Sequence, residues 1–269
     1  MENNAEKKRR IVNAVAAAVS FFAAFGLSRL LFFAASALLK TDAALPAGVS
    51  AALTAVSLGV GCAPALAVAR PRPEAEGEFP GSGEPLRSKK PAYLVPAAVF
   101  LLLAVNVLIS TSGLVKTDAP SYSTRELIIR AILGCTVYPV LEETFFRGVL
   151  LGALRERDDP IPARIGAAVV TAVGFAAFHP GSGYVFPFAA GVILAAIAPY
   201  GLTAKKRSLI PVGPIAAHAL YNLALYVSLA LTATGIEPVV PLSVFAGIAA
   251  IAAGVMLLTG GKARWKEKK

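Results

Sequence analysis

Two adjacent glutamates inside an apolar stretch are the first candidates for chemistry in this sequence. Glu142 and Glu143 lie in VYPVLEETFFRGVLLGAL, residues 137–154, and Arg147 follows Glu143 by four positions. An ionisable group at bilayer depth is costly unless it is paired or faces a wet cavity. Residues i and i+4 share a helix face, so Glu143 and Arg147 are predicted to pair as a structural clasp. Glu142 lies about 100° away around the helix and can face elsewhere.

The chain has two histidines, and both lie in apolar segments. His179 follows Phe175 by four positions in FAAFH, and His218 precedes Asn222 by four in HALYN. His218 and Asn222 are therefore predicted to point together into one cavity. Counted from the nearest basic residue on the predicted cytoplasmic side, Glu142, His179 and His218 lie roughly 20, 22 and 17 Å deep. The three helices thus bring polar groups to one layer of the membrane.

This set of groups could hydrolyse a peptide bond. A carboxylate and an imidazole on different helices, Glu142 and His179, can share a water and take its proton. A second imidazole and an amide, His218 and Asn222, can donate hydrogen bonds to the oxyanion that forms. These residue types therefore predict a glutamate-type hydrolase.

Other hydrolytic mechanisms fit the sequence less well. An aspartyl dyad needs two buried aspartates, and every aspartate lies in a predicted loop: Asp42, Asp118, Asp158 and Asp159. Ser182 is close to His179 in sequence but lies in a predicted turn. Zinc stays open as an alternative, since Glu142, His179 and His218 make a plausible three-ligand set. The HExxH pair of common metalloproteases is absent from the sequence.

The elements that must hold these residues are predicted to be membrane helices. The chain of 269 residues is 56% hydrophobic and only 16% charged, with a mean hydropathy of +0.67. A soluble domain is nearer about 25% charged. Eight apolar segments reach the length of a span, at about 11–39, 45–69, 92–115, 125–154, 163–180, 184–204, 209–233 and 239–259. The prediction is an all-α polytopic bundle of about eight transmembrane helices.

Basic residues indicate the orientation of the bundle. With the N-terminus in the cytoplasm, 20 of the 26 Lys and Arg residues fall on the inner side. The positive-inside rule then places both termini in the cytoplasm. The net charge of +10 is accounted for by topology and by contact with anionic lipid, so we expect no nucleic-acid partner.

We expect one integral-membrane domain over residues 1–269. Its motif-bearing core is about 125–233, and the segment 70–91, rich in Pro, Gly and charge, is predicted to be a flexible cytoplasmic loop. The two cysteines, Cys62 and Cys135, lie in apolar segments and offer no disulfide framework.

Several local signals predict where helices start and stop. Ser123 or Thr124 is the expected N-cap of the fourth span, with Glu126 in its first turn. Arg29 in the first span indicates that this helix is tilted or ends early. The fifth span should stop at HPGSG. Kinks or breaks are expected at four prolines: Pro187, Pro199, Pro211 and Pro214.

Three motifs carry a resemblance to a known family. EETFFR (142–147), FAAFH (175–179) and HALYN (218–222) resemble the EExxxR, FxxxH and HxxxN/D motifs of the CPBP family. This family of CAAX proteases and bacteriocin-processing enzymes, also called the Abi family, includes the Ras-converting CAAX endopeptidase. The resemblance implies an intramembrane glutamate-type endopeptidase with eight spans.

The resemblance also implies a role for each motif residue. Glu142 and His179 would activate the water, and His218 and Asn222 would stabilise the oxyanion. The supporting positions would be Glu143, Arg147 and Phe175, the last packed beneath His179. The glutamate mechanism needs no cofactor, although the family has also been described as metalloproteases that use zinc.

The substrate stays open at this point. The family implies a membrane-associated peptide or lipidated protein, cleaved in CAAX processing, bacteriocin maturation or immunity. The compact chain suggests a prokaryotic plasma membrane. Two other functions remain as alternatives. A non-catalytic membrane adaptor would keep the polar cluster as a clasp. A transporter would use it as a proton relay, but it would be expected to show an inverted repeat, and the sequence has none.

Overall fold

The computed structural model describes residues 4–40, 45–68, 93–112, 122–155, 159–179, 183–198, 210–232 and 234–266. All regular structure in these residues is helical. The helices are α1 (Asn4–Leu38), α2 (Ala47–Val68), α3 (Leu94–Ser112), α4 (Thr124–Cys135), α5 (Val137–Glu143), η1 (Thr144–Leu150), α6 (Leu151–Leu154), α7 (Ile161–Ala177), α8 (Val185–Ile197), α9 (Val212–Thr232) and α10 (Val239–Lys266). The predicted loop at 70–91 lies outside the described residues.

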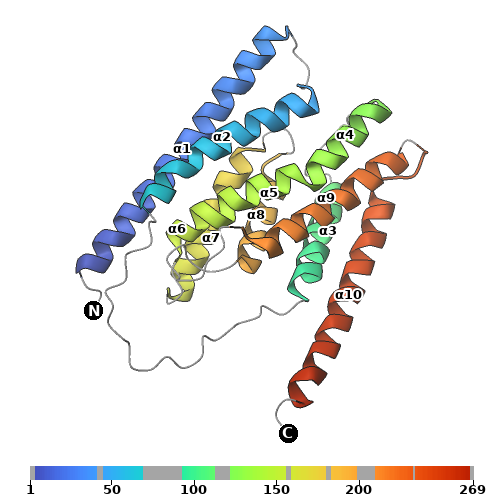
Figure 1. Ribbon diagram of the computed structural model, residues 1–269. Coiled ribbons are helices and arrows are strands. Elements are labelled where there is room, and N and C mark those ends of the chain that lie inside the picture. The colour runs from blue at the N-terminus through green and yellow to red at the C-terminus, as the bar shows by residue number, and fades with distance from the viewer. Residues whose placement is uncertain are drawn as a thin grey trace.

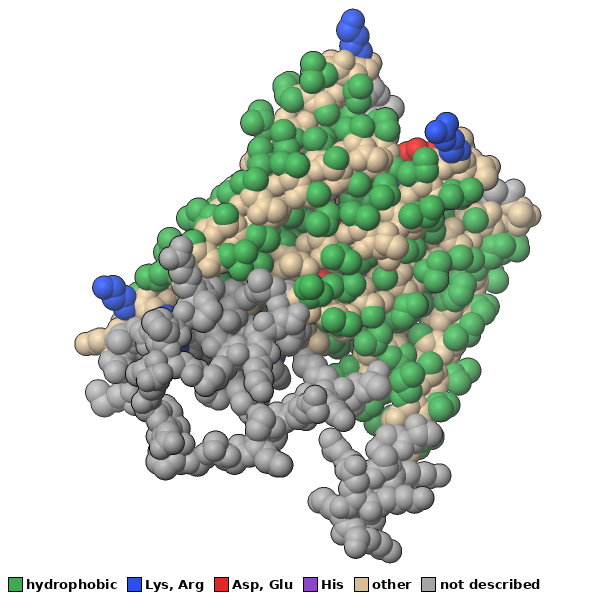
Figure 2. All heavy atoms as spheres, in the orientation of Figure 1, with side chains coloured by type: hydrophobic (Ala, Val, Ile, Leu, Met, Phe, Trp, Pro, Cys, Tyr) green, Lys and Arg blue, Asp and Glu red, His purple; other side chains and the backbone are tan. Residues whose placement is uncertain are grey.

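The predicted membrane bundle is confirmed. In the described residues, five helices are long and apolar enough to cross a membrane: α1, α2, α3, α9 and α10. The apolar helices α7 and α8 are shorter, with 17 and 13 residues. Hydrophobic side chains are spread along the described helices in Figure 2, and Lys and Arg appear at the ends of this face. That pattern is expected of helices that bury an apolar band in lipid.

The helices pack mainly as neighbouring pairs around a central broken segment. α1 packs on α2, α3 on α10, and α7 on α8. The segment formed by α4, α5, η1 and α6 runs between the α1–α2 pair and α9 (Figure 1). α1 begins and α10 ends at the same end of the bundle (Figure 1), as an even number of crossings requires.

The prolines behave differently from the sequence prediction. Pro187 and Pro214 lie in the first turns of α8 and α9, and Pro211 directly precedes α9. A first-turn residue has no intrahelical N–H bond to lose, so proline is tolerated there. The kinks or breaks expected at Pro187 and Pro214 are therefore not found, since α8 and α9 continue through them. At Pro211 the predicted span is interrupted as expected, because α9 begins directly after it, and Pro199 lies outside the described residues.

The first helix does not end early at Arg29. α1 continues to Leu38 and has 35 residues. At about 1.5 Å per residue it is roughly 52 Å long, well beyond a hydrocarbon core of about 30 Å. A helix this long must tilt or extend beyond the core, which is the other outcome that the sequence allowed.

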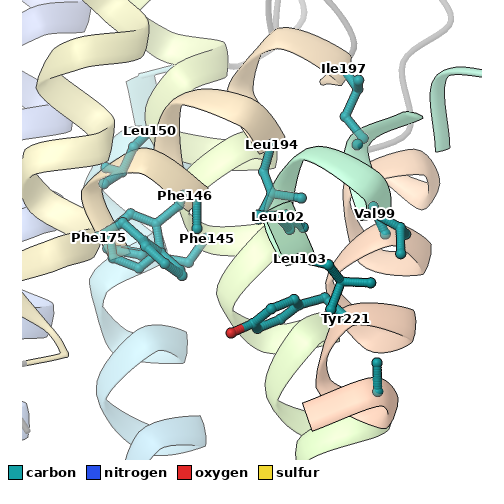
Figure 3. Packing of buried hydrophobic residues seen from close by; sticks show 14 of the residues in the cluster. Val99, Leu102, Leu103, Phe145, Phe146, Leu150, Phe175, Leu194, Ile197 and Tyr221 are labelled. Atoms are coloured by element: carbon teal, nitrogen blue, oxygen red, sulfur yellow. The ribbon is translucent and has the colours of Figure 1, made fainter. Parts of the chain in front are cut away.

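Aromatic side chains form the centre of the core beside the motif residues. The rings of Phe145 and Phe146 meet edge to face at 5.0 Å, and Phe146 meets Phe175 at 5.2 Å (Figure 3). All three are at most 3% exposed. Each such pair adds about 0.5–1.5 kcal/mol of stability beyond the burial of apolar area. The aromatic core next to the candidate site is therefore closely packed.

Candidate functional site

The segment that carries both glutamates is broken, whereas the sequence predicted one long span over 125–154. Its start is as expected, because the Ser123 side chain accepts a hydrogen bond from the Glu126 N–H. α4 then ends at Cys135, and Thr136 leaves the helical conformation with φ −123° and ψ −67°. Pro139 explains the break, since it cannot donate to the carbonyl of Cys135 and its ring crowds that carbonyl.

A π-helical stretch follows the glutamates directly. α5 ends at Glu143, and η1 covers Thr144–Leu150, with the Leu151 N–H bonded to the Phe146 carbonyl. π-turns inside α-helices are rare and often occur at functional sites. The break and the π-stretch together set the directions of the side chains at 142–147.

Glu143 is the centre of a fully buried ion cluster. Its Oε1 accepts from Arg147 at 3.0 Å, as predicted, and from Nδ1 of His218 at 2.9 Å. Arg147 also donates to the Gly191 carbonyl of α8 at 3.2 Å. The side chains of Glu143 and Arg147 are 0% exposed. The cluster therefore ties α5 and η1 to α8 and α9.

Glu142 faces the other histidine. Its Oε2 lies 3.5 Å from Nε2 of His179. Nδ1 of His179 lies 2.8 Å from the Phe175 carbonyl, and because a carbonyl only accepts, Nδ1 carries the proton of that bond. In the neutral ring, Nε2 then presents its lone pair on the side of Glu142. The adjacent glutamates thus face two different histidines.

Phe175 connects the two halves of the site. Its ring centroid is 4.4 Å from that of His179 and 6.1 Å from that of His218. The guanidinium carbon of Arg147 lies 4.4 Å from the same centroid. The predicted packing of Phe175 beneath His179 is observed, and the ring also receives a cation–π contact from Arg147.

Asn222 departs from the expected arrangement. It shares with His218 the face of α9 that packs on the α4–α5 segment. Its Nδ2 donates to the Gly134 carbonyl of α4 at 2.7 Å. The side chain is therefore directed to the end of α4, whereas His218 is directed to Glu143. The amide has a second N–H, which this bond does not use.

Exposure separates the site into a sealed part and an accessible part. The side chains of His179, Glu142 and His218 are 29%, 13% and 11% exposed. Those of Glu143 and Arg147 are completely buried. The first group is thus partly accessible, while the second can act only through its neighbours.

The comparison with protein families agrees with this geometry. Residues 124–224 match the family model described as Type II CAAX prenyl endopeptidase Rce1-like. This segment is an Rce1-like domain. It starts at the first residue of α4 and ends within α9, so it contains all seven candidate residues. The match confirms the resemblance seen in the three motifs and places the segment in a protease family. Neither a curated protein nor a solved structure matches the chain.

The side chains of the Rce1-like domain do not assemble the zinc ligand set considered above. In the described residues, no group of three or more His, Cys, Asp or Glu side chains is arranged to hold a metal ion. His218 turns Nδ1 to Glu143, while Glu142 pairs with His179.

Sequence reasoning missed two glycines of the Rce1-like domain whose carbonyls hold site residues. A Cβ on Gly191 would lie 2.7 Å from the Ala172 Cα, and one on Gly134 would lie 2.5 Å from the ring of Tyr226. Both glycines therefore permit a close helix approach that brings a backbone carbonyl to the site. The available signal was an isolated glycine inside a helical pattern.

Proposed function

We propose that this protein is an intramembrane glutamate-type endopeptidase in which Glu142 and His179 activate the attacking water. The observation that carries the proposal is the contact between Glu142 and His179, 3.5 Å apart and partly accessible. A water beside both groups can give its proton to the carboxylate while the imidazole accepts a hydrogen bond from it. General base catalysis of this kind contributes about 10²–10⁴-fold.

His218 and Asn222 stabilise the oxyanion in the proposed mechanism. Since Nδ1 of His218 is bonded to Glu143, its Nε2 donates only when the ring holds both protons. In the proposed mechanism the buried Glu143 carboxylate, whose Oε1 lies 2.9 Å from Nδ1, is the counter-charge of the doubly protonated ring. The second N–H of Asn222 supplies the other hydrogen bond. One such donor is worth about 3–4 kcal/mol.

The proposed substrate is a membrane-associated peptide or lipidated protein. The description of the matched family names a CAAX prenyl endopeptidase. A prenylated CAAX peptide is therefore the first substrate to test. Bacteriocin-like peptides are the second class. Both would reach the site from the membrane, since the bundle exposes mainly hydrophobic side chains along its length (Figure 2).

The test compares new peptide termini in membranes from cells that express wild type or Glu142→Gln. Glu126→Gln is the matched control, because Glu126 lies on the same segment and pairs with Arg130 away from the site. Thermal unfolding in detergent checks that all three proteins fold. We expect termini that appear with wild type and the control but not with Glu142→Gln. Identical termini in all three, with a farnesylated CAAX peptide also left uncut, would favour the adaptor function.

A further inference from the structure

Arg29 is the one charged residue of α1 beyond Arg10. Its guanidinium reaches another helix, because one terminal nitrogen donates to the Ala177 carbonyl of α7 at 2.9 Å. The guanidinium carbon also lies 4.9 Å from the ring centroid of Phe25. An arginine within a membrane helix is costly and usually has a specific partner. Its partner here is the turn that carries His179.

The last carbonyls of α7 need donors that the helix itself cannot supply. The Phe175 carbonyl receives the Phe178 N–H at 3.2 Å and Nδ1 of His179 at 2.8 Å. The Ala176 carbonyl receives the His179 N–H at 2.9 Å. Two of the three final carbonyls are thus satisfied within the turn, and His179 supplies donors to both.

Within the part of the chain that the structure describes, Arg29 is the donor to the Ala177 carbonyl. Residue 180 is a proline and has no N–H to donate back to the turn. The Arg29 guanidinium supplies one of the donors that the last carbonyls of a helix need. A cation at a helix C-terminus also interacts favourably with the helix dipole. Arg29 therefore completes the set of bonds that fixes the end of α7.

Aromatic packing holds α1 against this same turn. Phe178, the C-cap of α7, meets Phe25 at 5.4 Å and Phe21 at 5.9 Å. A Cβ on Gly174 would lie 2.9 Å from the Phe21 ring, so the absence of a side chain permits this approach. Arg29 thus acts from a helix that already lies on the end of α7.

A second arginine of α1 tethers the other end of α7. Arg10 forms an ion pair with Asp159 at 2.7 Å, two residues before α7 begins. From Arg10 to Arg29 the helix rises about 28 Å, and from Asp159 to Ala177 about 27 Å. The two arginines of α1 thus reach the two ends of α7, but only the Arg29 end lies next to the site.

We propose that Arg29 is a positioning residue that holds the last turn of α7 and thereby keeps Nε2 of His179 directed at Glu142. This inference deepens the proposed function and rests on it for the catalytic role of His179. Arg10 stabilises the same helix pair without positioning His179. The two arginines are therefore a matched pair for an experiment.

The experiment uses the two histidines as reporters. The full chain is labelled with 15N,13C-histidine, reconstituted in phospholipid nanodiscs, and its two imidazole signals are assigned with His218→Gln. We expect Arg29→Met to shift or broaden the His179 signals and to leave those of His218 unchanged. Arg29→Lys, which keeps the charge with a single nitrogen, should lie between wild type and Arg29→Met. Arg10→Met should leave the His179 signals at their wild-type positions.

Kinetics on a substrate that wild type cleaves provides the second readout. A displacement of about 1 Å at a reacting group can cost 10²-fold, so we expect Arg29→Met to lower kcat about 10–100-fold. KM should stay within about twofold, because the proposed role of His179 is to act on the water rather than to bind the substrate, and Arg10→Met should keep kcat within about twofold. Should Arg29→Met not fold, Arg29→Lys carries the same comparison with a smaller effect.

Two results would overturn the inference: His179 signals unchanged in the Arg29 variants, or changed equally by Arg10→Met. A wild type that cleaves no peptide overturns the proposed function instead. In that case the imidazole signals still decide whether Arg29 positions His179, so the two failures are distinguishable.

Discussion

The buried pair of Glu143 and Arg147 allows a quantitative prediction for the change Glu143→Gln. The two side chains are 0% exposed and 3.0 Å apart. At that distance and an effective dielectric constant of about 20, their Coulomb energy is about 5 kcal/mol. Glutamine keeps the shape but removes the charge, so Arg147 loses its hydrogen-bonded counter-ion in the core. Breaking a buried pair in this way costs about 3–5 kcal/mol.

Two orphaned atoms support a value at the upper end of this range. Neither Oε2 of Glu143 nor Nε of Arg147 has a hydrogen-bond partner in the part of the chain that the structure describes. Glutamine places an amide group where one carboxylate oxygen lay. One buried group is then a donor without an acceptor, which adds about 1–3 kcal/mol before any relaxation.

The chain provides a matched control on the same segment. Glu126 and Arg130 also form an i,i+4 pair, at 2.8 Å, but their side chains are 29% and 19% exposed. Solvent screens this pair, so Glu126→Gln should cost only about 0.3–0.5 kcal/mol. The two substitutions therefore change the same residue type in the same sequence relation, and they differ mainly in burial.

The assay is reversible unfolding of the purified full chain in mixed detergent micelles, followed by circular dichroism. A loss of about 3–5 kcal/mol lowers the folded-to-unfolded ratio by roughly 10²–10⁴-fold. The double variant Glu143→Gln/Arg147→Met should lose less than the sum of the single losses, because no lone charge stays buried. The reasoning is refuted if Glu143→Gln costs no more than Glu126→Gln.

Three further predictions concern packing and cofactor use. Gly191→Ala should lower the free energy of unfolding by about 1–3 kcal/mol, because the added Cβ would lie 2.7 Å from the Ala172 Cα. Gly166→Ala is the control and should leave the free energy of unfolding unchanged, because a Cβ there meets no atom within 4 Å. Ser20→Ala should cost about 1–3 kcal/mol, since the Ser20 hydroxyl accepts the buried Ala65 N–H at 2.9 Å, and Ser20→Thr should recover part of the loss. Dialysis against a zinc chelator should leave peptide cleavage unchanged; loss of activity together with stoichiometric zinc would assign the reaction to the zinc-dependent version of the protease.

Hydropathy and spacing predicted the parts of the structure that depend on membrane depth. Glu142 and His179 lie on different helices, yet their similar distance from the basic end of each span predicted that they would meet. The i,i+4 rule predicted the bond between Glu143 and Arg147. These predictions succeeded because rise per residue and periodicity are the same in every α-helix, so depth and face follow from residue numbers alone.

Contacts that involve backbone carbonyls were outside the reach of sequence reasoning. Asn222 bonds the Gly134 carbonyl and Arg147 bonds that of Gly191. Every residue has a carbonyl, so no side-chain pattern distinguishes these acceptors. They become available only after helix packing has placed a glycine against its neighbour. The bond from His218 to Glu143 was missed for a related reason, since it depends on how α9 is rotated against the broken α4–α5 segment.

Charge balance explains why one dipeptide faces two histidines. With both glutamates ionised, Arg147 compensates only one of them, and the site keeps one excess negative charge. A charge is unfavourable in a low-dielectric interior unless polar groups surround it. The two imidazoles are such groups, since Nε2 of His179 lies 3.5 Å from Oε2 of Glu142 and Nδ1 of His218 lies 2.9 Å from Oε1 of Glu143.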